Sequence, residues 1–87
     1  MKLLKNAAAG TLESSDCRVC VSPADGVILE YNGANSVIFA DRTKKLVDDV
    51  LKENDLSGAK ITIQDQGAIE ITIRARLECA LERAAEE

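Results

Sequence analysis

The sequence AKITIQDQGAIEITIR, residues 59–74, carries the clearest pattern in the chain. Over residues 59–64, isoleucines alternate with polar residues, and they do so again over residues 68–74. This period of two is typical of β-strands with one buried face. Asp65, Gln66 and Gly67 lie between the two runs and are residue types that favour turns. The stretch therefore predicts a β-hairpin.

A second pair of strands is predicted nearer the N-terminus. Residues 17–22 (CRVCVS) alternate in the same way, as do residues 27–32 (VILEYN). The connection Pro23-Ala24-Asp25-Gly26 has the proline and glycine typical of a turn. We expect these two strands to form a hairpin as well.

Two helices are predicted around the second hairpin. The first begins with Asn35 or Ser36 as its N-cap and ends before Gly58. The second runs nearly to the C-terminus. Residues of one face recur at helical spacing in both. They are Thr43, Leu46, Val47, Val50 and Leu51 in the first and Leu77, Ala80, Leu81 and Ala84 in the second.

The order of these elements predicts an α+β fold in one small domain. Strand-strand-helix occurs twice, and a mainly antiparallel sheet with two helices on one face buries all the apolar sides. Residues 1–16 show no consistent apolar period, so we expect a flexible, irregular N-terminal segment. Residues 17–87 then form the folded domain.

Composition excludes several classes of function. The 87-residue chain has a net charge of −4 and two aromatic residues, which disfavours nucleic acid as a partner. Its longest apolar runs are far shorter than the ~20 residues that cross a membrane. No apolar signal-peptide core follows the first residues. We therefore expect a cytoplasmic protein with no membrane partner.

Residues for catalysis or metal binding are scarce. Histidine is absent, which removes the commonest general base and zinc-binding nitrogen. Cys17 and Cys20 form a C-x-x-C pair, and a small redox protein is one alternative interpretation. In a strand, however, residues three apart point to opposite faces, so a structural role is favoured for this pair. Cys79 lies in the last predicted helix beside its apolar stripe, where a buried or half-buried packing role is favoured.

Charged residues gather in two places. Arg42, Lys44 and Lys45 lie early in the first predicted helix, and Arg74 and Arg76 follow the last predicted strand. Such cations could bind a phosphate or a carboxylate. Solubility and local ion pairs are the favoured interpretation of this pattern.

The segment GTLESSD, residues 10–16, holds two serines in the irregular N-terminal region. No catalytic residues surround them in sequence. An exposed serine on such a segment is a good acceptor for a covalent attachment, because a modifying enzyme can take the segment into its own site.

This segment, extended by one residue to Ala9, resembles the N-terminal motif of the citrate lyase acyl carrier protein, the gamma subunit of that enzyme. The resemblance continues over nearly the whole chain. It includes Asp49-Val50-Leu51, Asp65-Gln66-Gly67-Ala68 and residues 73–78 (IRARLE). Citramalate lyase has closely similar carrier subunits, and malonate decarboxylase has a more distant one.

The resemblance implies that Ser14 is the attachment site. In the family, the serine after the glutamate carries 2'-(5''-phosphoribosyl)-3'-dephospho-CoA through a phosphodiester bond. Its terminal thiol carries acetyl and citryl groups as thioesters. Ser15 follows directly, where some relatives have glycine. Glu13 and Asp16 flank the acceptor, and their charge is suited to guiding a basic modifying enzyme.

The implied partners do the chemistry. They are the citrate lyase alpha subunit (acyl transferase), the beta subunit (acyl lyase), the enzyme that attaches the prosthetic group and an acetylating ligase. The chain itself is then a non-catalytic carrier that needs no metal. Alternatives are a carrier of citramalate lyase or malonate decarboxylase and an unmodified interaction adaptor.

Overall fold

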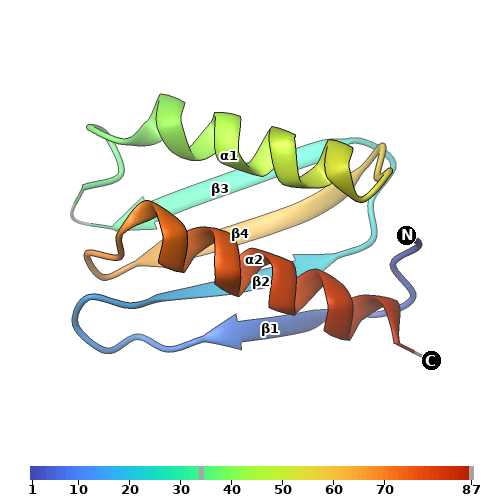
Figure 1. The fold of residues 1–87 in the computed structure, drawn as a ribbon, viewed down its shortest axis with the longest axis horizontal. Coiled ribbons are helices and arrows are strands. Elements are labelled where there is room, and N and C mark those ends of the chain that lie inside the picture. The colour runs from blue at the N-terminus through green and yellow to red at the C-terminus, as the bar shows by residue number, and fades with distance from the viewer. Residues whose placement is uncertain (34, 87) are drawn as a thin grey trace.

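The computed structural model describes residues 1–33 and 35–86 and contains a sheet covered on one face by two helices (Figure 1). This arrangement confirms the α+β class and the placement of both helices on one side. The elements are β1 (Ala7–Gly10), β2 (Cys17–Ser22), β3 (Val27–Gly33), α1 (Ala40–Glu53), β4 (Ala59–Asp65) and α2 (Glu70–Ala85).

The strand order is β1-β2-β4-β3, so neither predicted hairpin forms. β4 lies between β2 and β3, pairing antiparallel with β2 and parallel with β3. Four residues of β4 are buried, which suits a central strand. The α1 helix is long enough to carry the chain from the end of β3 back to the start of β4, as a parallel pairing requires.

Residues 68–74 were predicted as a strand, and this prediction was wrong: α2 begins at Glu70. Both edges of β4 are already paired, so this strand would have no partner beside β4. Ile73 instead begins the buried stripe of a helix that continues through Leu77, Leu81 and Ala84. The alternation of isoleucines in residues 68–74 therefore does not reflect a buried strand face.

The α1 helix begins at Ala40, later than the predicted cap at Asn35 or Ser36. The residues before it form turns instead. The Ser36 N–H and hydroxyl both donate to the Gly33 carbonyl, at 3.2 and 3.0 Å. The first helical hydrogen bond runs from the Thr43 N–H to the Phe39 carbonyl. The capping propensity of serine is thus used to close a turn at the end of β3.

The N-terminal segment is less irregular than expected, because residues 7–10 form β1 and pair with β2. Leu3 is buried, and the Leu4 N–H donates to the Ala84 carbonyl at 2.9 Å. Arg83 Nη1 donates to the Ala8 carbonyl at 2.7 Å. Small alanines gave no apolar period to detect, yet they let α2 pack closely over this edge of the sheet.

The core lies between the sheet and the helices. It is built from aliphatic side chains of β2, β4, α1 and α2, with Ile61, Ile63 and Ile73 fully buried. Within residues 1–33 and 35–86, neither helix has the length and apolarity of a membrane span.

Gly10 closes β1 under a tight constraint. Its φ of +93° is unfavourable for other residues, and an added Cβ would lie 1.9 Å from the Cys17 carbonyl oxygen. At Gly26, no described residue other than its two chain neighbours has an atom within 4 Å of the same position.

We predict that Gly10→Ala destabilises the protein by more than about 1 kcal/mol, because the backbone of β1 or β2 must shift. Gly26→Ala is the matched control and should stay within about 0.5 kcal/mol of the unaltered chain. Urea denaturation followed by circular dichroism measures both. Equal stability of the two variants would contradict the described closure of β1.

Candidate functional site

Three connections meet at one end of the sheet. β1, β3 and β4 end there, and β2 begins there because it runs in the opposite direction. Asp65, the last residue of β4, is paired with both Cys17 and Gly33. The β1–β2 loop (residues 11–16) and the β4–α2 turn (residues 66–69) are therefore neighbours, as Figure 1 shows.

The β1–β2 loop carries the predicted attachment residue, Ser14, in an exposed position. Main-chain hydrogen bonds hold the residues after it. The Ser15 N–H donates to the Gln66 carbonyl at 2.8 Å, and the Gln66 N–H donates to the Asp16 carbonyl at 2.9 Å. Ser15 has a left-handed backbone with φ +68°, which turns the chain from the loop into β2.

Asp16 fixes the base of this loop. Its carboxylate accepts hydrogen bonds from the Thr11 hydroxyl at 2.6 Å, the Thr11 N–H at 3.2 Å and the Cys17 N–H at 2.7 Å. Arg76 of α2 adds two more, from Nε at 3.1 Å and Nη2 at 3.0 Å. One side chain thus joins both ends of the loop to the helix.

These contacts stabilise the charged form of Asp16. The Arg76 guanidinium, with the Thr11 hydroxyl and the Cys17 N–H, holds the pKa of Asp16 far below its usual value. In return, the carboxylate raises the pKa of Arg76. The sequence suggested that Glu13 and Asp16 together guide a basic modifying enzyme. Asp16 is paired within the fold, so Glu13 is the acidic residue that this loop exposes.

The loop fits a bulky covalent group at Ser14. Its hydroxyl is exposed, and no hydrogen bond ties it to another part of the chain that the structure describes. The neighbouring hydroxyl, on Ser15, belongs to a residue whose N–H is bound to the β4–α2 turn. A group attached at Ser14 would project into solvent without displacing packed side chains.

The cysteines do not form a redox pair. Cys17 faces the core, where burial raises the pKa of its thiol to about 11, with smaller contributions from the charges of Asp16 and Asp65. Cys20 lies on the opposite face of β2. Cys17, Cys20 and Cys79 are all free. Among the described residues, no three acidic, histidine or cysteine side chains are grouped to hold a metal.

Asp65 and Tyr31 form a polar pair that sequence reasoning did not identify. The buried Asp65 carboxylate accepts the Tyr31 hydroxyl at 2.6 Å and the N–H groups of Gly67 and Ala68 at 2.9 and 2.8 Å. Burial, together with this hydrogen bond, raises the pKa of Tyr31. The turn signal of Asp65-Gln66-Gly67 was the available clue. The aspartate positions the start of α2 beside the Ser14 loop.

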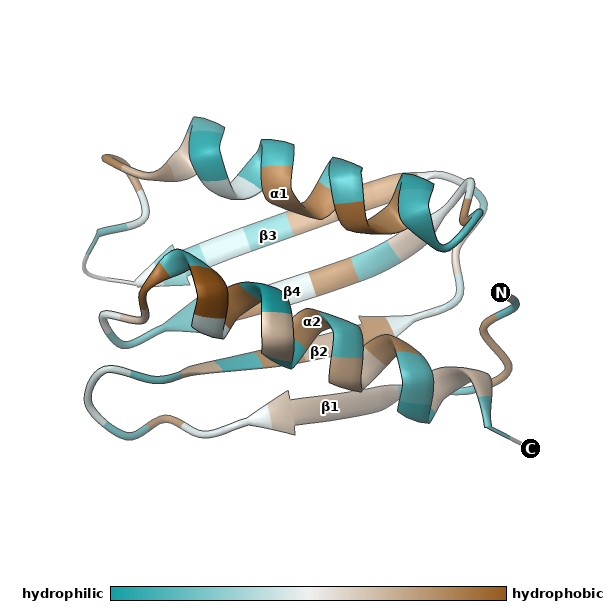
Figure 2. Cartoon of the chain, in the orientation of Figure 1, coloured by the Kyte–Doolittle hydropathy of each residue, from teal (hydrophilic) through white to brown (hydrophobic). Residues whose placement is uncertain are grey.

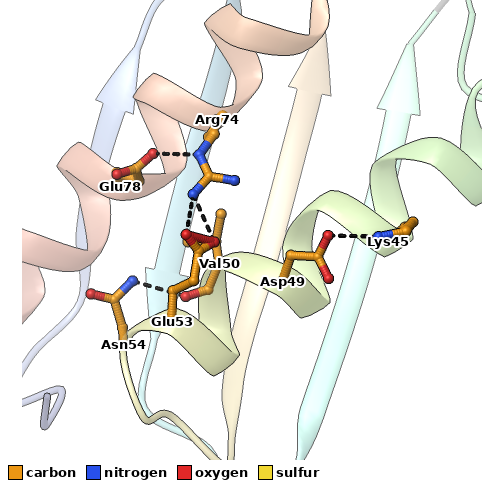
Figure 3. Close-up of polar contacts among 7 residues, drawn as sticks. All are labelled: Lys45, Asp49, Val50, Glu53, Asn54, Arg74 and Glu78. Carbon is orange, nitrogen blue, oxygen red and sulfur yellow. Dashed lines mark hydrogen bonds and ion pairs between the residues drawn. The ribbon is translucent and has the colours of Figure 1, made fainter.

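Most of the basic residues considered for anion binding are paired (Figure 3). Arg74 Nη2 donates to both carboxylate oxygens of Glu53 at 2.6 and 2.7 Å, and its Nε donates to Glu78 at 2.9 Å. Lys45 binds Asp49 at 2.8 Å. The Arg74–Glu53 pair links the two helices, whereas the other two pairs each lie within one helix. All three support the interpretation of local ion pairing.

The chain is similar to known proteins over nearly its whole length. The family model of the malonate decarboxylase delta subunit (MdcD) matches residues 4–84. The citrate lyase acyl carrier protein of Treponema denticola is 39% identical over all 87 residues, covering 100% of both chains. That of Pectobacterium atrosepticum is 41% identical over 97% of this chain and 88% of its own.

The chain belongs to the citrate lyase acyl carrier protein family. A third member, from an Enterobacter strain, is 43% identical and covers 100% of this chain and 91% of its own. The fold also matches a chain in the crystal structure of a Pseudomonas malonate decarboxylase hetero-tetramer in complex with malonate. The TM-score is 0.70 at 24% identity, over 93% of this chain and 84% of that one.

The lowered pKa of Asp16 predicts how the stability conferred by its network depends on pH. The pKa of an unfolded aspartate is about 3.9. Because the folded value lies lower, the stabilisation is fully present above that pH and is lost as pH falls through the folded value. Asp16→Asn should therefore be less stable than the unaltered chain at pH 7, with the difference shrinking below about pH 4. Denaturation at several pH values measures it; a constant difference would contradict the prediction.

Proposed function

We propose that this chain is the acyl carrier subunit of a citrate lyase, with its prosthetic group attached at Ser14. Membership of the citrate lyase acyl carrier protein family supports the role. The observation that carries the site is the exposed Ser14 hydroxyl on a loop that Asp16 ties to α2. The group is 2'-(5''-phosphoribosyl)-3'-dephospho-CoA, joined to the serine through a phosphodiester.

The group supplies a terminal thiol that carries acyl groups as thioesters. The chain positions the attachment point: the β1–β2 loop exposes it, and α2 and the sheet hold the base of that loop. A flexible tether of this kind gives effective concentrations in the mM range at a partner's active site. The partners that we propose are the alpha acyl transferase, the beta acyl lyase, the attachment enzyme and the acetylating ligase.

Within the carrier class, a malonate decarboxylase subunit is the second candidate. The family model that matches residues 4–84 carries that name, and the fold is shared with a chain of such an enzyme. The higher identity to citrate lyase carriers favours the first candidate. Reconstitution with the citrate lyase alpha and beta subunits separates the two, because a malonate decarboxylase carrier would not restore citrate cleavage.

We predict that Ser14→Ala prevents modification. When the chain is co-expressed with the attachment enzyme of its host, intact mass should rise by the mass of the group, and Ser14→Ala should abolish the increase. The variant should keep its far-ultraviolet circular dichroism spectrum, since Ser14 is exposed.

Ser15→Gly is the matched control, because glycine accepts the left-handed φ of +68° and removes the second hydroxyl without strain. This variant should gain the full mass. Full modification of Ser14→Ala would overturn the assigned site. An unaltered chain that gains no mass would overturn the carrier function itself.

A further inference from the structure

Four large apolar side chains are strongly exposed at the end of the sheet that carries the Ser14 loop. Val37 and Ile38, in the turns before α1, are 91% and 75% exposed. Ile69 and Ile71, at the start of α2, are 65% and 71% exposed. The same two segments are brown in Figure 2, against the largely teal outer surface of α1.

The fold does not require these residues to be apolar. The buried stripe of α2 begins at Ile73, so Ile69 and Ile71 lie outside it. β-Branched residues are also not favoured in helices. A group of exposed apolar residues at one end of a domain is a candidate surface for binding another molecule.

A cleft of about 480 Å³ between the two helices adjoins this surface. Ile71 lines it, together with Arg42, Lys45 and Arg74. Lys45 and Arg74 already have carboxylate partners (Figure 3). The cleft therefore combines an exposed aliphatic side chain with cations, of which two are already neutralised.

Arg42 differs from the other two cations. Its Nε and Nη2 are buried and have no hydrogen-bond acceptor within the part of the chain that the structure describes. The guanidinium lies 4.0 Å from the centre of the Phe39 ring, which attracts a cation but accepts no ordinary hydrogen bond. Glu70 also lines the cleft, yet among the described residues no ion pair joins Arg42 to Glu70. Arg42 is partly exposed, so its guanidinium is placed to pair with an anionic group of another molecule.

We propose that Val37, Ile38, Ile69, Ile71 and Arg42 form the surface on which a catalytic subunit of the lyase docks, presenting an aliphatic side chain beside a carboxylate. The isoleucines match the aliphatic group, and the uncompensated charge of Arg42 matches the carboxylate. Arginine and large apolar residues at the centre of an interface are typical of strong binding contacts.

This surface, which rests on the proposed carrier function, also explains how the acyl group is delivered. The Ser14 loop and the start of α2 are held together through Gln66, by hydrogen bonds of 2.8 and 2.9 Å. A subunit bound at Ile69 and Ile71 is therefore beside the attachment point. The tether then needs to reach only across one interface.

The test is the affinity of the full chain for the purified complex of citrate lyase alpha and beta subunits, measured by isothermal titration calorimetry. Ile69→Ser with Ile71→Ser should weaken binding about tenfold or more, and so should Val37→Ser with Ile38→Ser. Arg42→Gln should weaken binding by a similar factor and lower its sensitivity to salt. All these positions are at least partly exposed, so folding should persist, as circular dichroism will verify.

Ile28→Ser is the matched control. Ile28 is also an exposed isoleucine, but it lies near the start of β3, at the other end of the sheet. The Ile28→Ser variant should bind the lyase subunits with the same affinity as the unaltered chain. Equal affinity of all the variants would overturn the docking surface, as would an equal loss with Ile28→Ser.

Two further measurements separate the explanations. If sedimentation shows that the chain alone dimerises through the isoleucines and the lyase subunits bind all variants equally, the surface joins two copies and the proposal fails. Mass analysis after treatment with the attachment enzyme tests the carrier function independently. A chain that gains the expected mass but docks equally well in all variants overturns only the docking surface.

Discussion

The Asp16 carboxylate is the contact on which the functional end of the molecule depends. Five hydrogen bonds reach it, from Thr11, Cys17 and Arg76. The first two close the loop on itself, and the third ties it to α2. Without this carboxylate, the Arg76 guanidinium would lose its partner and the loop would lose the contact between its two ends. The exposed serine is thus carried on a loop with a fixed base.

In the proposed function, partner subunits carry out the chemistry and this chain positions the attachment point. The buried thiol of Cys17 is held protonated, and two acidic side chains at this end of the sheet, Asp16 and Asp65, are engaged in local hydrogen bonds. At this end the chain exposes the Ser14 hydroxyl, the Glu13 carboxylate and a set of aliphatic side chains. A carrier suits this arrangement, because it must be recognised by several enzymes without reacting itself.

The sequence predicted the class of fold and three of the four strands that form. The alternation in residues 17–22 and 59–64 reflects buried faces, and in residues 27–32 it reflects a face that is only partly buried, at Leu29 and Tyr31. Pairing was wrong because alternation does not specify which strands are neighbours. Residues 68–74 misled for a different reason: Ile69 and Ile71 are exposed, so their spacing reports a surface and not a core. β1 was missed because alanines carry almost no periodic signal.

The candidate site was predictable only in part. Ser14 came from a resemblance to a family motif, since an isolated exposed serine has no chemical signature. Arg76 lies 60 residues from Asp16, and no local pattern links two such distant positions. Arg42 and Asp65 likewise depend on tertiary neighbours. The expected flexibility of residues 1–16 remains a prediction, although the contacts of β1 and Asp16 favour a held loop.

Amide hydrogen exchange by NMR tests most directly whether the base of the β1–β2 loop is fixed by its hydrogen bonds. The N–H groups of Thr11, Ser15 and Cys17 should exchange slowly, because each is hydrogen-bonded, and Arg76→Gln should speed their exchange while leaving the Ile63 amide of β4 protected. Exchange of all three at the rate of an unstructured peptide, or the same rates in Arg76→Gln, would contradict the account.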